Sequence, residues 1–212
     1  MNLLPEASLI KTGPVDHADW NYRPLLGVVQ RTRFRLIDKL LDDERVDRIL
    51  EVGYGSGVLM PHLKGMCREL YGIDIHPHAS EVEEVLRRHE VEARLVSGSV
   101  VDLPYEDAFF DRVVIVSAIE YVDDIDAACR ELVRVLRPGG AVVLVTPGQS
   151  WFLDLCLRVL TGERASENYD DRRTRLRPAL LEHFRVEREI TVPPMIRMYT
   201  ALRLTPAEPA RG

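Results

Sequence analysis

The chain of 212 residues has little of several features that mark particular classes of protein. Its three cysteines, Cys67, Cys129 and Cys156, lie far apart in apolar or helical contexts, so we expect buried free thiols rather than a disulfide. A basic excess is also missing, because 28 Lys and Arg face 34 Asp and Glu for a net charge of −6. This balance argues against a nucleic-acid partner.

Long apolar runs are absent as well. No stretch approaches the roughly 20 apolar residues of a membrane-spanning helix, and the N-terminus lacks a basic region followed by a long apolar segment. We therefore expect a cytoplasmic protein with no membrane partner. The histidines show no metal-ligand spacing, and His76-Pro77-His78 is better explained as a turn, so we expect no metal site.

What the chain does have is a glycine-rich turn, Glu51-Val52-Gly53-Tyr54-Gly55-Ser56-Gly57, between an apolar strand and a helix. Glycine has no Cβ, so such a turn can lie directly against a ligand. A dinucleotide fingerprint would need a third glycine where Val58 stands. Asp74 ends the next apolar run, where an acid can accept both hydroxyls of a ribose. With Glu51 as a second carboxylate, the pattern favours a nucleoside with a cationic tail over a phosphate-bearing ligand.

Over roughly residues 45 to 150 the chain resembles the class I S-adenosylmethionine-dependent methyltransferases, in particular the small-molecule branch that is similar to the enzymes of ubiquinone and menaquinone biosynthesis. Five landmarks recur in order, and together they are far more specific than any one of them. They are the glycine turn, Asp74, the segment 97–105 (SGSVVDLPY), the segment 110–114 (FDRVV) with Glu120-Tyr121-Val122 after it, and Leu136-Arg137-Pro138-Gly139-Gly140.

The resemblance implies S-adenosyl-L-methionine as cofactor and a set of residues that contact it. These are Glu51, Gly53, Tyr54, Gly55, Gly57, Asp74, Ile75, Ser99, Val100 and Ser117. Ser99 departs from the family, which usually has an aspartate there, and a neutral hydroxyl is a weaker acceptor for the adenine amino group. Asp102 is a secondary candidate for the missing carboxylate.

The alternating pattern of apolar runs predicts an α/β fold, namely a Rossmann-like, seven-stranded, mostly parallel sheet with helices on both faces and a C-terminal antiparallel strand pair. We expect three parts: an N-terminal extension with a docking helix that Pro24 opens (1–44), the methyltransferase domain (45–205) and a disordered tail (206–212). Ser80 and Glu83 have the spacing of a capping box, and Pro138-Gly139-Gly140 should end a helix. The charged stretch 161–177 is expected to be a loop or a partly ordered cover whose arginines are solvated rather than an anion site.

The methyl acceptor is expected to be a small molecule, with O-, N- or C-methylation left open. Tyr121 stands where many relatives carry a histidine, and it either orients or deprotonates the acceptor or closes the pocket by packing. His17, Trp20 and Tyr22 could form a lid, and Trp151 and Tyr169 could line the acceptor side, although docking and core packing explain such aromatics equally well. Two alternatives stay open, a nicotinamide-dependent Rossmann oxidoreductase and a non-catalytic S-adenosylmethionine-binding module. A homodimer is possible.

Overall fold

The computed structural model describes the chain except for residues 15, 25, 42–44, 148–171, 194–197 and 208–212. Its strands are β1 (Val46–Val52), β2 (Cys67–Asp74), β3 (Arg94–Ser97), β4 (Phe110–Val116), β5 (Leu136–Pro147), β6 (Phe184–Val192) and β7 (Tyr199–Pro206). The helices are α1 (Leu26–Leu40), α2 (Met60–Lys64), α3 (Ala79–Arg88), α4 (Ile125–Val135) and α7 (Arg172–His183), with short helical turns η1 (Glu6–Ser8), η2 (Ala18–Tyr22) and η3 (Ile119–Tyr121).

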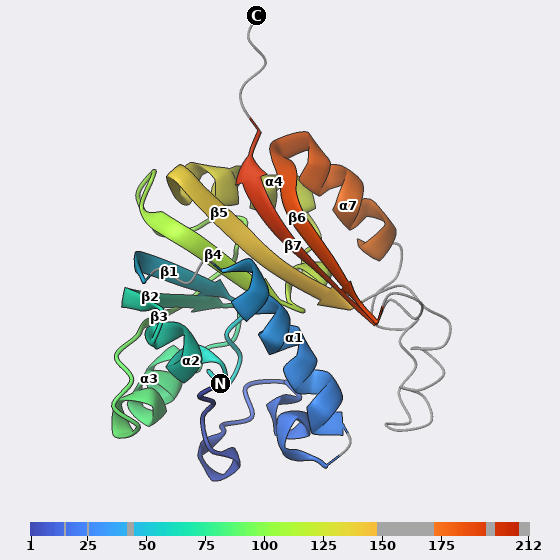
Figure 1. Cartoon of the computed structure of the whole chain (residues 1–212). Helices are drawn as coiled ribbons and strands as arrows, with labels where there is room; N and C mark the ends of the chain where they lie inside the picture. Colours follow the sequence, from blue (N-terminus) through green and yellow to red (C-terminus); the bar gives the residue numbers. More distant parts are fainter. Residues whose placement is uncertain (15, 25, 42–44, 148–171, 194–197, 208–212) are drawn as a thin grey trace, which may run out of the picture.

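All seven described strands form one sheet in the order β3-β2-β1-β4-β5-β7-β6 (Figure 1). The pairs among β1 to β5 are parallel, whereas β7 runs antiparallel to both β5 and β6. This arrangement confirms the expected mostly parallel sheet with a C-terminal antiparallel pair. The strand order reverses between β1 and β4, and such a switch point is where open α/β sheets bind ligands.

Two apolar cores cover the two faces of the sheet, because the central strands bury both of their faces. Strand β5 shows this most clearly: Val143 and Val145 belong to the core under α1, α2 and α3, while Val142 and Leu144 belong to the core under α4 and α7. Helix α4 presents Ile125, Ala128, Cys129, Leu132 and Val135 to the second core. Helices therefore lie on both faces, as expected.

Three local expectations differ from the structure. The Ser80–Glu83 capping box does not form: α3 begins at Ala79, and Glu83 accepts instead from the Leu95 N–H, which ties the helix to β3. The Pro138-Gly139-Gly140 segment lies within β5, which begins at Leu136 directly after α4. Residues 172–177, expected in a loop, begin α7. At the C-terminus Pro206 ends β7 and the Ala207 N–H donates to the His183 carbonyl.

The N-terminal segment docks on the domain through backbone contacts. The Leu4 N–H donates to the Val58 carbonyl, and the fully buried Leu4 side chain joins the core of α1, α2 and α3. Tyr22 donates to the Leu4 carbonyl, and Arg31 donates to the Asn21 carbonyl at the start of α1. Helix α1 itself packs against β7, β5 and β4. The N-terminal segment and α1 thus reach the carboxyl ends of the parallel strands.

Candidate functional site

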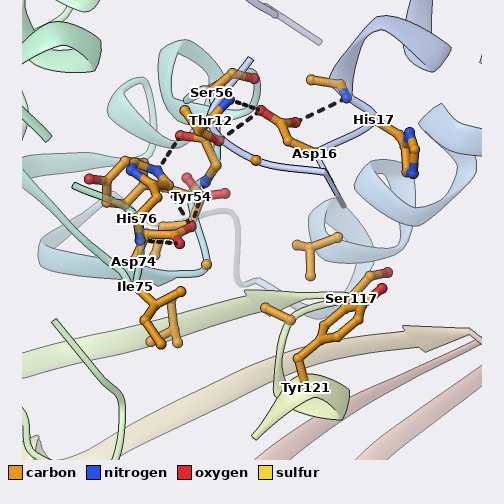
Figure 2. A pocket seen from close by; sticks show the side chains of 18 of the residues that line it. Thr12, Asp16, His17, Tyr54, Ser56, Asp74, Ile75, His76, Ser117 and Tyr121 are labelled. Carbon is orange, nitrogen blue, oxygen red and sulfur yellow. Dashed lines mark hydrogen bonds and ion pairs between the residues drawn. The ribbon is translucent and has the colours of Figure 1, made fainter. Parts of the chain in front are cut away.

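A cavity of about 720 Å³ lies at the carboxyl ends of the parallel strands. Figure 2 shows three groups of side chains around it: Tyr54, Asp74 and His76 together, then Thr12, Asp16 and His17 from the N-terminal segment, and Ser117 with Tyr121. These groups come from segments far apart in the sequence. The N-terminal segment therefore folds back over the sheet and contributes part of the cavity wall.

The glycine turn leaves β1 in a conformation that only glycine adopts without strain. Gly53 has φ +76°, and a Cβ there would lie 2.3 Å from the Ala118 Cβ. Gly57 also has positive φ, but it does not line the cavity. A Cβ at this position would lie 3.0 Å from Cγ1 of Val82, so the glycine allows α3 to pack closely here. Gly53, Tyr54 and Gly55 line the cavity, as the resemblance implies.

Asp74 at the end of β2 is held in place by the glycine turn. Its Oδ2 accepts from the Gly55 N–H at 2.8 Å, and its Oδ1 accepts weakly from the His76 N–H at 3.4 Å. His76 is 8% exposed, donates from Nε2 to the Gly55 carbonyl at 3.0 Å and lies 3.8 Å from Asp74 Oδ2. The carboxylate is thereby oriented at the cavity wall with acceptor capacity left for two ligand hydroxyls.

Glu51 at the end of β1 is the most strongly perturbed acid of the site. The residue is 4% exposed, and Oε2 is buried with no hydrogen-bond partner among the described residues. Burial, with a smaller contribution from the negative charge of Asp74, raises the pKa of Glu51 to about 8, whereas Arg33 acts in the opposite direction. A buried acid in this state is poised for a cationic ligand group, which would favour its ionised form.

Beyond Asp74 the wall becomes apolar. Ile75 is 84% exposed although it lines the cavity, and Val100 lines it from the loop after β3. Ser99 lies there too, where its Oγ accepts from the Val101 N–H at 3.4 Å. Asp102 is exposed and does not line the cavity. Figure 2 shows Ile75 beside Asp74, so a flat ring attached to a sugar held by Asp74 would meet this side chain.

Ser117 and Tyr121 follow β4 on the other side of the switch point. Ser117 has φ +51°, an unusual value for a residue with a side chain, and its Oγ is buried with no partner among the described residues. Its N–H donates to the Val145 carbonyl, which ties the strained residue to β5. Tyr121 is 37% exposed and lines the cavity from η3.

The N-terminal segment closes the cavity above the glycine turn. Asp16 accepts from the Thr12 hydroxyl at 2.9 Å and from the Ala18 N–H at 3.1 Å, and it lies close to Gly55. His17 and Trp20 stack with their ring centroids 4.1 Å apart, and both line the cavity. Tyr22, in contrast, does not line it, because its hydroxyl is bound to the Leu4 carbonyl.

Several cavity residues were not predicted from the sequence. Helix α1 contributes the stripe Leu26, Val29, Gln30, Arg33 and Phe34, and other segments add Thr12, Asp16, Ser56, His76 and Tyr199. The periodic spacing of the α1 residues was a usable signal, although it indicated only a docking face. Nothing in the sequence pattern distinguished Thr12, Asp16 or Tyr199, since the tertiary fold alone brings them to the cavity.

Two of the predicted residues, Trp151 and Tyr169, fall outside the described residues. One polar cluster lies apart from this site. Asp126, Glu182 and His183 place potential metal-ligand atoms within 4.8 Å of one another, away from the cavity. His183 is 2.6 Å from Asp126, which also pairs with Arg130, so ordinary ion pairing accounts for this group.

Comparison with known proteins relates this geometry to one family. Residues 50–144 match the model of a family described as a methyltransferase domain. This segment is similar to the methyltransferase domains of that family. The chain is 33% identical over 105 residues to a demethylmenaquinone methyltransferase of Staphylococcus aureus, which supports the expected branch. That match spans 48% of this chain and 44% of the relative, so the chain matches less than half the length of that curated enzyme.

Solved structures confirm the fold of the methyltransferase domain. A SAM-dependent methyltransferase from Aquifex aeolicus has a TM-score of 0.67 at 15% identity, covering 85% of this chain and 98% of that one. The [4+2]-cyclase SpnF has a TM-score of 0.65 at 16% identity, covering 84% of this chain and 82% of the cyclase. Because such different activities share the fold, function has to be argued from the residues of the site.

Proposed function

We propose that this chain is an S-adenosylmethionine-dependent methyltransferase that acts on a small molecule. The observation that carries the proposal is the pair of acids at neighbouring strand ends, with Asp74 oriented at the cavity wall and Glu51 buried beside it without a partner for Oε2. A nucleoside with a cationic amino-acid tail matches both carboxylates, whereas a dinucleotide pyrophosphate would bring negative charge to them.

The residues of this chain fit the cofactor part by part. Asp74 accepts from the ribose hydroxyls, Glu51 accepts from the ammonium group of the methionine part, and the buried Ser56 Oγ, which has no partner among the described residues, is available as a donor. Ile75 and Val100 cover the adenine from its apolar faces, and Ser99 contributes the hydroxyl that replaces the usual carboxylate. Gly53, Tyr54 and Gly55 form the floor beneath the methionine part.

When bound, the cofactor would supply a methyl group from its sulfonium, which an acceptor lone pair attacks in line while the neutral thioether leaves. The contribution of the protein to such a step is mostly positioning, at about 3 to 3.5 Å between the reacting atoms. Tyr121 lines the cavity beside Ser117, and we assign Tyr121 to orienting the acceptor, whereas Ser117 stays a predicted cofactor contact. Tyr121 is the group best placed to take a proton from an acceptor hydroxyl or amine. His17 and Trp20 close the cavity from above.

Calorimetric titration with S-adenosylmethionine, S-adenosylhomocysteine and NADH tests the cofactor assignment. We expect binding of the first two and no heat with NADH. The reverse order of affinity would favour the oxidoreductase alternative, which no comparison supports. Mass detection of methylated products in a metabolite mixture then separates an enzyme from a binding module. Bound cofactor with no methylated product from any acceptor would support the latter.

No described helix combines the length and apolar character needed to cross a membrane. The cytoplasmic location, the absence of a nucleic-acid partner and the homodimer stay predictions, which fractionation, a gel-shift assay and sedimentation can test.

A further inference from the structure

The loop after β2 holds a histidine that ties three segments of the chain together. His76 is 8% exposed and lines the cavity, and Figure 2 shows it beside Tyr54 and Asp74. Its Nε2 atom lies 3.0 Å from the Gly55 carbonyl oxygen, and its Nδ1 atom lies 3.1 Å from the backbone nitrogen of His78. The glycine turn, the end of β2 and the start of α3 therefore meet at one imidazole.

These two contacts are compatible with one protonation state of the ring. The Gly55 carbonyl can only accept, so Nε2 has to carry a hydrogen, whereas the His78 N–H can only donate, so Nδ1 has to present its lone pair. The neutral imidazole with its hydrogen on Nε2 meets both conditions. Because the ring is buried, water does not readily replace either partner. His76 thus forms both hydrogen bonds only while it is neutral.

The same imidazole controls how Asp74 is presented to the cavity. Gly55 binds both residues, because its carbonyl accepts from the ring of His76 while its N–H donates to Asp74 Oδ2 at 2.8 Å. The His76 N–H adds a weaker contact to Oδ1 of the carboxylate at 3.4 Å. The neutral ring therefore holds the glycine turn and the carboxylate in an arrangement that leaves acceptor capacity for ribose hydroxyls.

A second proton on the ring would disturb this arrangement in two ways. A hydrogen on Nδ1 would face the His78 N–H, so that two donors would meet and the ring would have to move. The positive charge would also lie close to Asp74, whose Oδ2 is 3.8 Å from Nε2 of His76. An ion pair between the two side chains would occupy the oxygen that a ribose hydroxyl needs. Protonation of this histidine therefore opposes binding of a ribose.

The other titratable groups around the ring are engaged elsewhere or stay neutral. Tyr54 contacts the ring edge to face, with the centroids 4.9 Å apart, and burial raises the pKa of this phenol. The ring of His78 lies 5.7 Å away and binds Glu81 of α3 at 2.9 Å. On the same helix Glu83 accepts from a backbone N–H of β3. Asp16 lies against the glycine turn and accepts from donors of the N-terminal segment.

We propose that His76 is a positioning residue that supports cofactor binding only in its neutral form, so that the cofactor site loses affinity when this imidazole takes up a proton. This inference rests on the proposed methyltransferase function and adds a pH-dependent regulation of the same site. Because the ligand prefers the neutral form, its affinity falls as pH falls through the range in which histidine side chains change charge, about pH 5 to 8.

Calorimetric titration with S-adenosylhomocysteine at about pH 7.5 and about pH 5.5 tests this proposal. His76→Gln keeps a donor near the position of Nε2 but carries no charge at either pH. Between the two pH values the affinity of the wild type should fall about five- to tenfold more than that of His76→Gln. Glu51 is present in both proteins, so its own pH dependence cancels in this comparison.

The size of the side chain at position 76 separates positioning from charge. Near pH 7.5 His76→Gln should bind S-adenosylhomocysteine within about fivefold of the wild type, because a donor to Gly55 is retained. His76→Ala loses this donor and should bind about tenfold more weakly at that pH, with the same reduced pH dependence as His76→Gln. Equal affinities of the alanine variant and the wild type near pH 7.5 would overturn the positioning role.

His78→Gln is the matched control, because it removes a histidine two positions away and keeps the backbone N–H that binds His76. The His78 side chain contacts Glu81 and does not line the cavity, so the wild-type pH dependence should persist in this variant. Unfolding curves at both pH values verify that each protein is folded. If His78→Gln lost the pH dependence as His76→Gln does, the assignment to His76 would be wrong.

Nitrogen NMR of the histidine rings in the wild-type protein gives a test that depends on no variant. The nitrogen chemical shifts distinguish the two neutral tautomers, and the ring of His76 should carry its hydrogen on Nε2. By reciprocity this ring should take up its second proton at a lower pH in the S-adenosylhomocysteine complex than in the free protein. A hydrogen on Nδ1, or identical titration of the free and bound protein, contradicts the proposal.

The outcomes separate this inference from the function on which it rests. A protein that binds neither S-adenosylmethionine nor S-adenosylhomocysteine at either pH fails the proposed function itself. A protein that binds both, with the same pH dependence in the wild type and in His76→Gln, overturns only the role of His76.

Discussion

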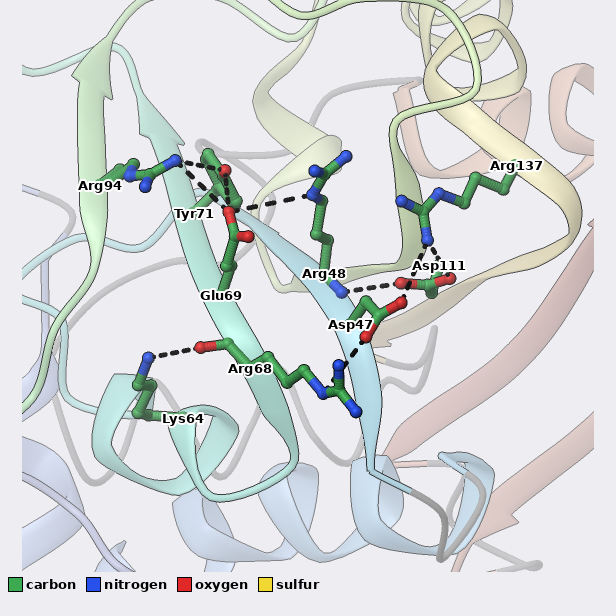
Figure 3. Close-up of polar contacts among 9 residues, drawn as sticks. All are labelled: Asp47, Arg48, Lys64, Arg68, Glu69, Tyr71, Arg94, Asp111 and Arg137. Carbon is green, nitrogen blue, oxygen red and sulfur yellow. Dashed lines mark hydrogen bonds and ion pairs between the residues drawn. The ribbon is translucent and has the colours of Figure 1, made fainter.

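The two ends of the sheet carry polar side chains in opposite states. At the amino ends, the first residues of β1, β2, β4 and β5 form a continuous set of ion pairs (Figure 3). Asp47 contacts Arg68 and Arg137, and Arg137 also binds Asp111 at 3.0 Å. The Arg48 N–H donates to Asp111 at 2.7 Å. Each of these charges has a partner, and all of them are at least partly exposed to solvent.

At the carboxyl ends several polar side chains are deeply buried and incompletely paired. Glu51 Oε2, Ser56 Oγ, Ser117 Oγ and Arg33 Nε all lack a partner within the described part of the chain. A sheet stabilised only for folding would not retain such groups, because each costs free energy when desolvated. From this difference we infer that the polar side chains at the amino ends stabilise the fold, whereas those at the carboxyl ends bind a ligand. Matched substitutions at the two ends test this conclusion.

The largest expected effect is at the two glycines with positive φ at opposite ends of the sheet. Gly53→Ala at the carboxyl end combines backbone strain with a clash against Ala118, so we expect a loss of about 2 to 5 kcal/mol of unfolding free energy. Gly139→Ala at the amino end has φ +79° but nothing within 4 Å of the new Cβ, so only the strain of about 1 to 2 kcal/mol applies. Equal losses in chemical denaturation would contradict the packing argument.

The next effect concerns the buried acid. Between the ordinary glutamate pKa of about 4.3 and about 8, the folded protein keeps a proton on Glu51 that the unfolded chain releases, so ligand-free stability falls as pH rises through this window. Glu51→Gln should abolish this slope and stabilise the free protein by about 2 to 4 kcal/mol at pH 8. It should also weaken S-adenosylmethionine binding, since an amide provides no negative charge.

Glu69 at the amino end of the sheet should give stability a pH dependence of opposite sign to that of Glu51. A hydrogen bond from Tyr71 holds the pKa of this exposed carboxyl below its ordinary value, with Arg48 and Arg94 contributing. Its stabilising contribution is present above the ordinary pKa and is lost as pH falls through the lowered value. Stability curves of Glu69→Gln from pH 3 to pH 9 should therefore differ from wild type at neutral pH, with cofactor affinity unchanged. If Glu51→Gln and Glu69→Gln changed the pH dependence of the unfolding free energy in the same direction relative to wild type, this contrast would be refuted.

A smaller effect is expected at Asp74. Asp74→Ala removes the acceptor for the ribose hydroxyls and should weaken S-adenosylmethionine binding by about 1.5 to 3 kcal/mol, the range for a lost hydrogen bond to a charged group. Asp47→Ala at the amino end should change this affinity by less than a factor of about two, because its partners are an exposed arginine, Arg68, and a partly exposed one, Arg137, and neither lines the cavity. Calorimetry on both variants measures the difference. Unchanged affinity in Asp74→Ala would remove this residue from the site.

The smallest effect is expected for the ion pairs of the amino ends. Arg137→Met removes contacts to Asp47 and Asp111 that are partly exposed, so the unfolding free energy should fall by no more than about 1 kcal/mol. Cofactor affinity should not change. A measurable loss of binding in this variant would show that the two ends of the sheet are energetically coupled, which the comparison above does not predict.

Much of the cofactor half of the cavity could be predicted because its parts are contiguous in the chain. The glycine turn, Asp74 and the loop at Ser99 each follow an apolar strand, and the carboxyl ends of parallel strands necessarily meet at one edge. Local details were less predictable. Glu83 binds the Leu95 N–H instead of capping its helix, since a tertiary partner competed successfully with the local one.

The part of the cavity wall that α1 contributes shows what sequence patterns do not contain. The periodicity of α1 predicted a docking face, but Gln30 and Arg33 line the cavity only because that face is placed over β4, β5 and β7. The same holds for Asp16, which lies against Gly55 although 38 positions, from 17 to 54, separate them in the chain. The order of strands and helices, the glycine turn and the acids at the ends of β1 and β2 can be derived from the amino-acid order alone, because local backbone preferences and apolar periodicity depend on neighbouring residues. Which distant side chains meet at the cavity, and which of them lack partners among the described residues, follows from the folded arrangement, because burial and pairing depend on contacts that no local pattern specifies.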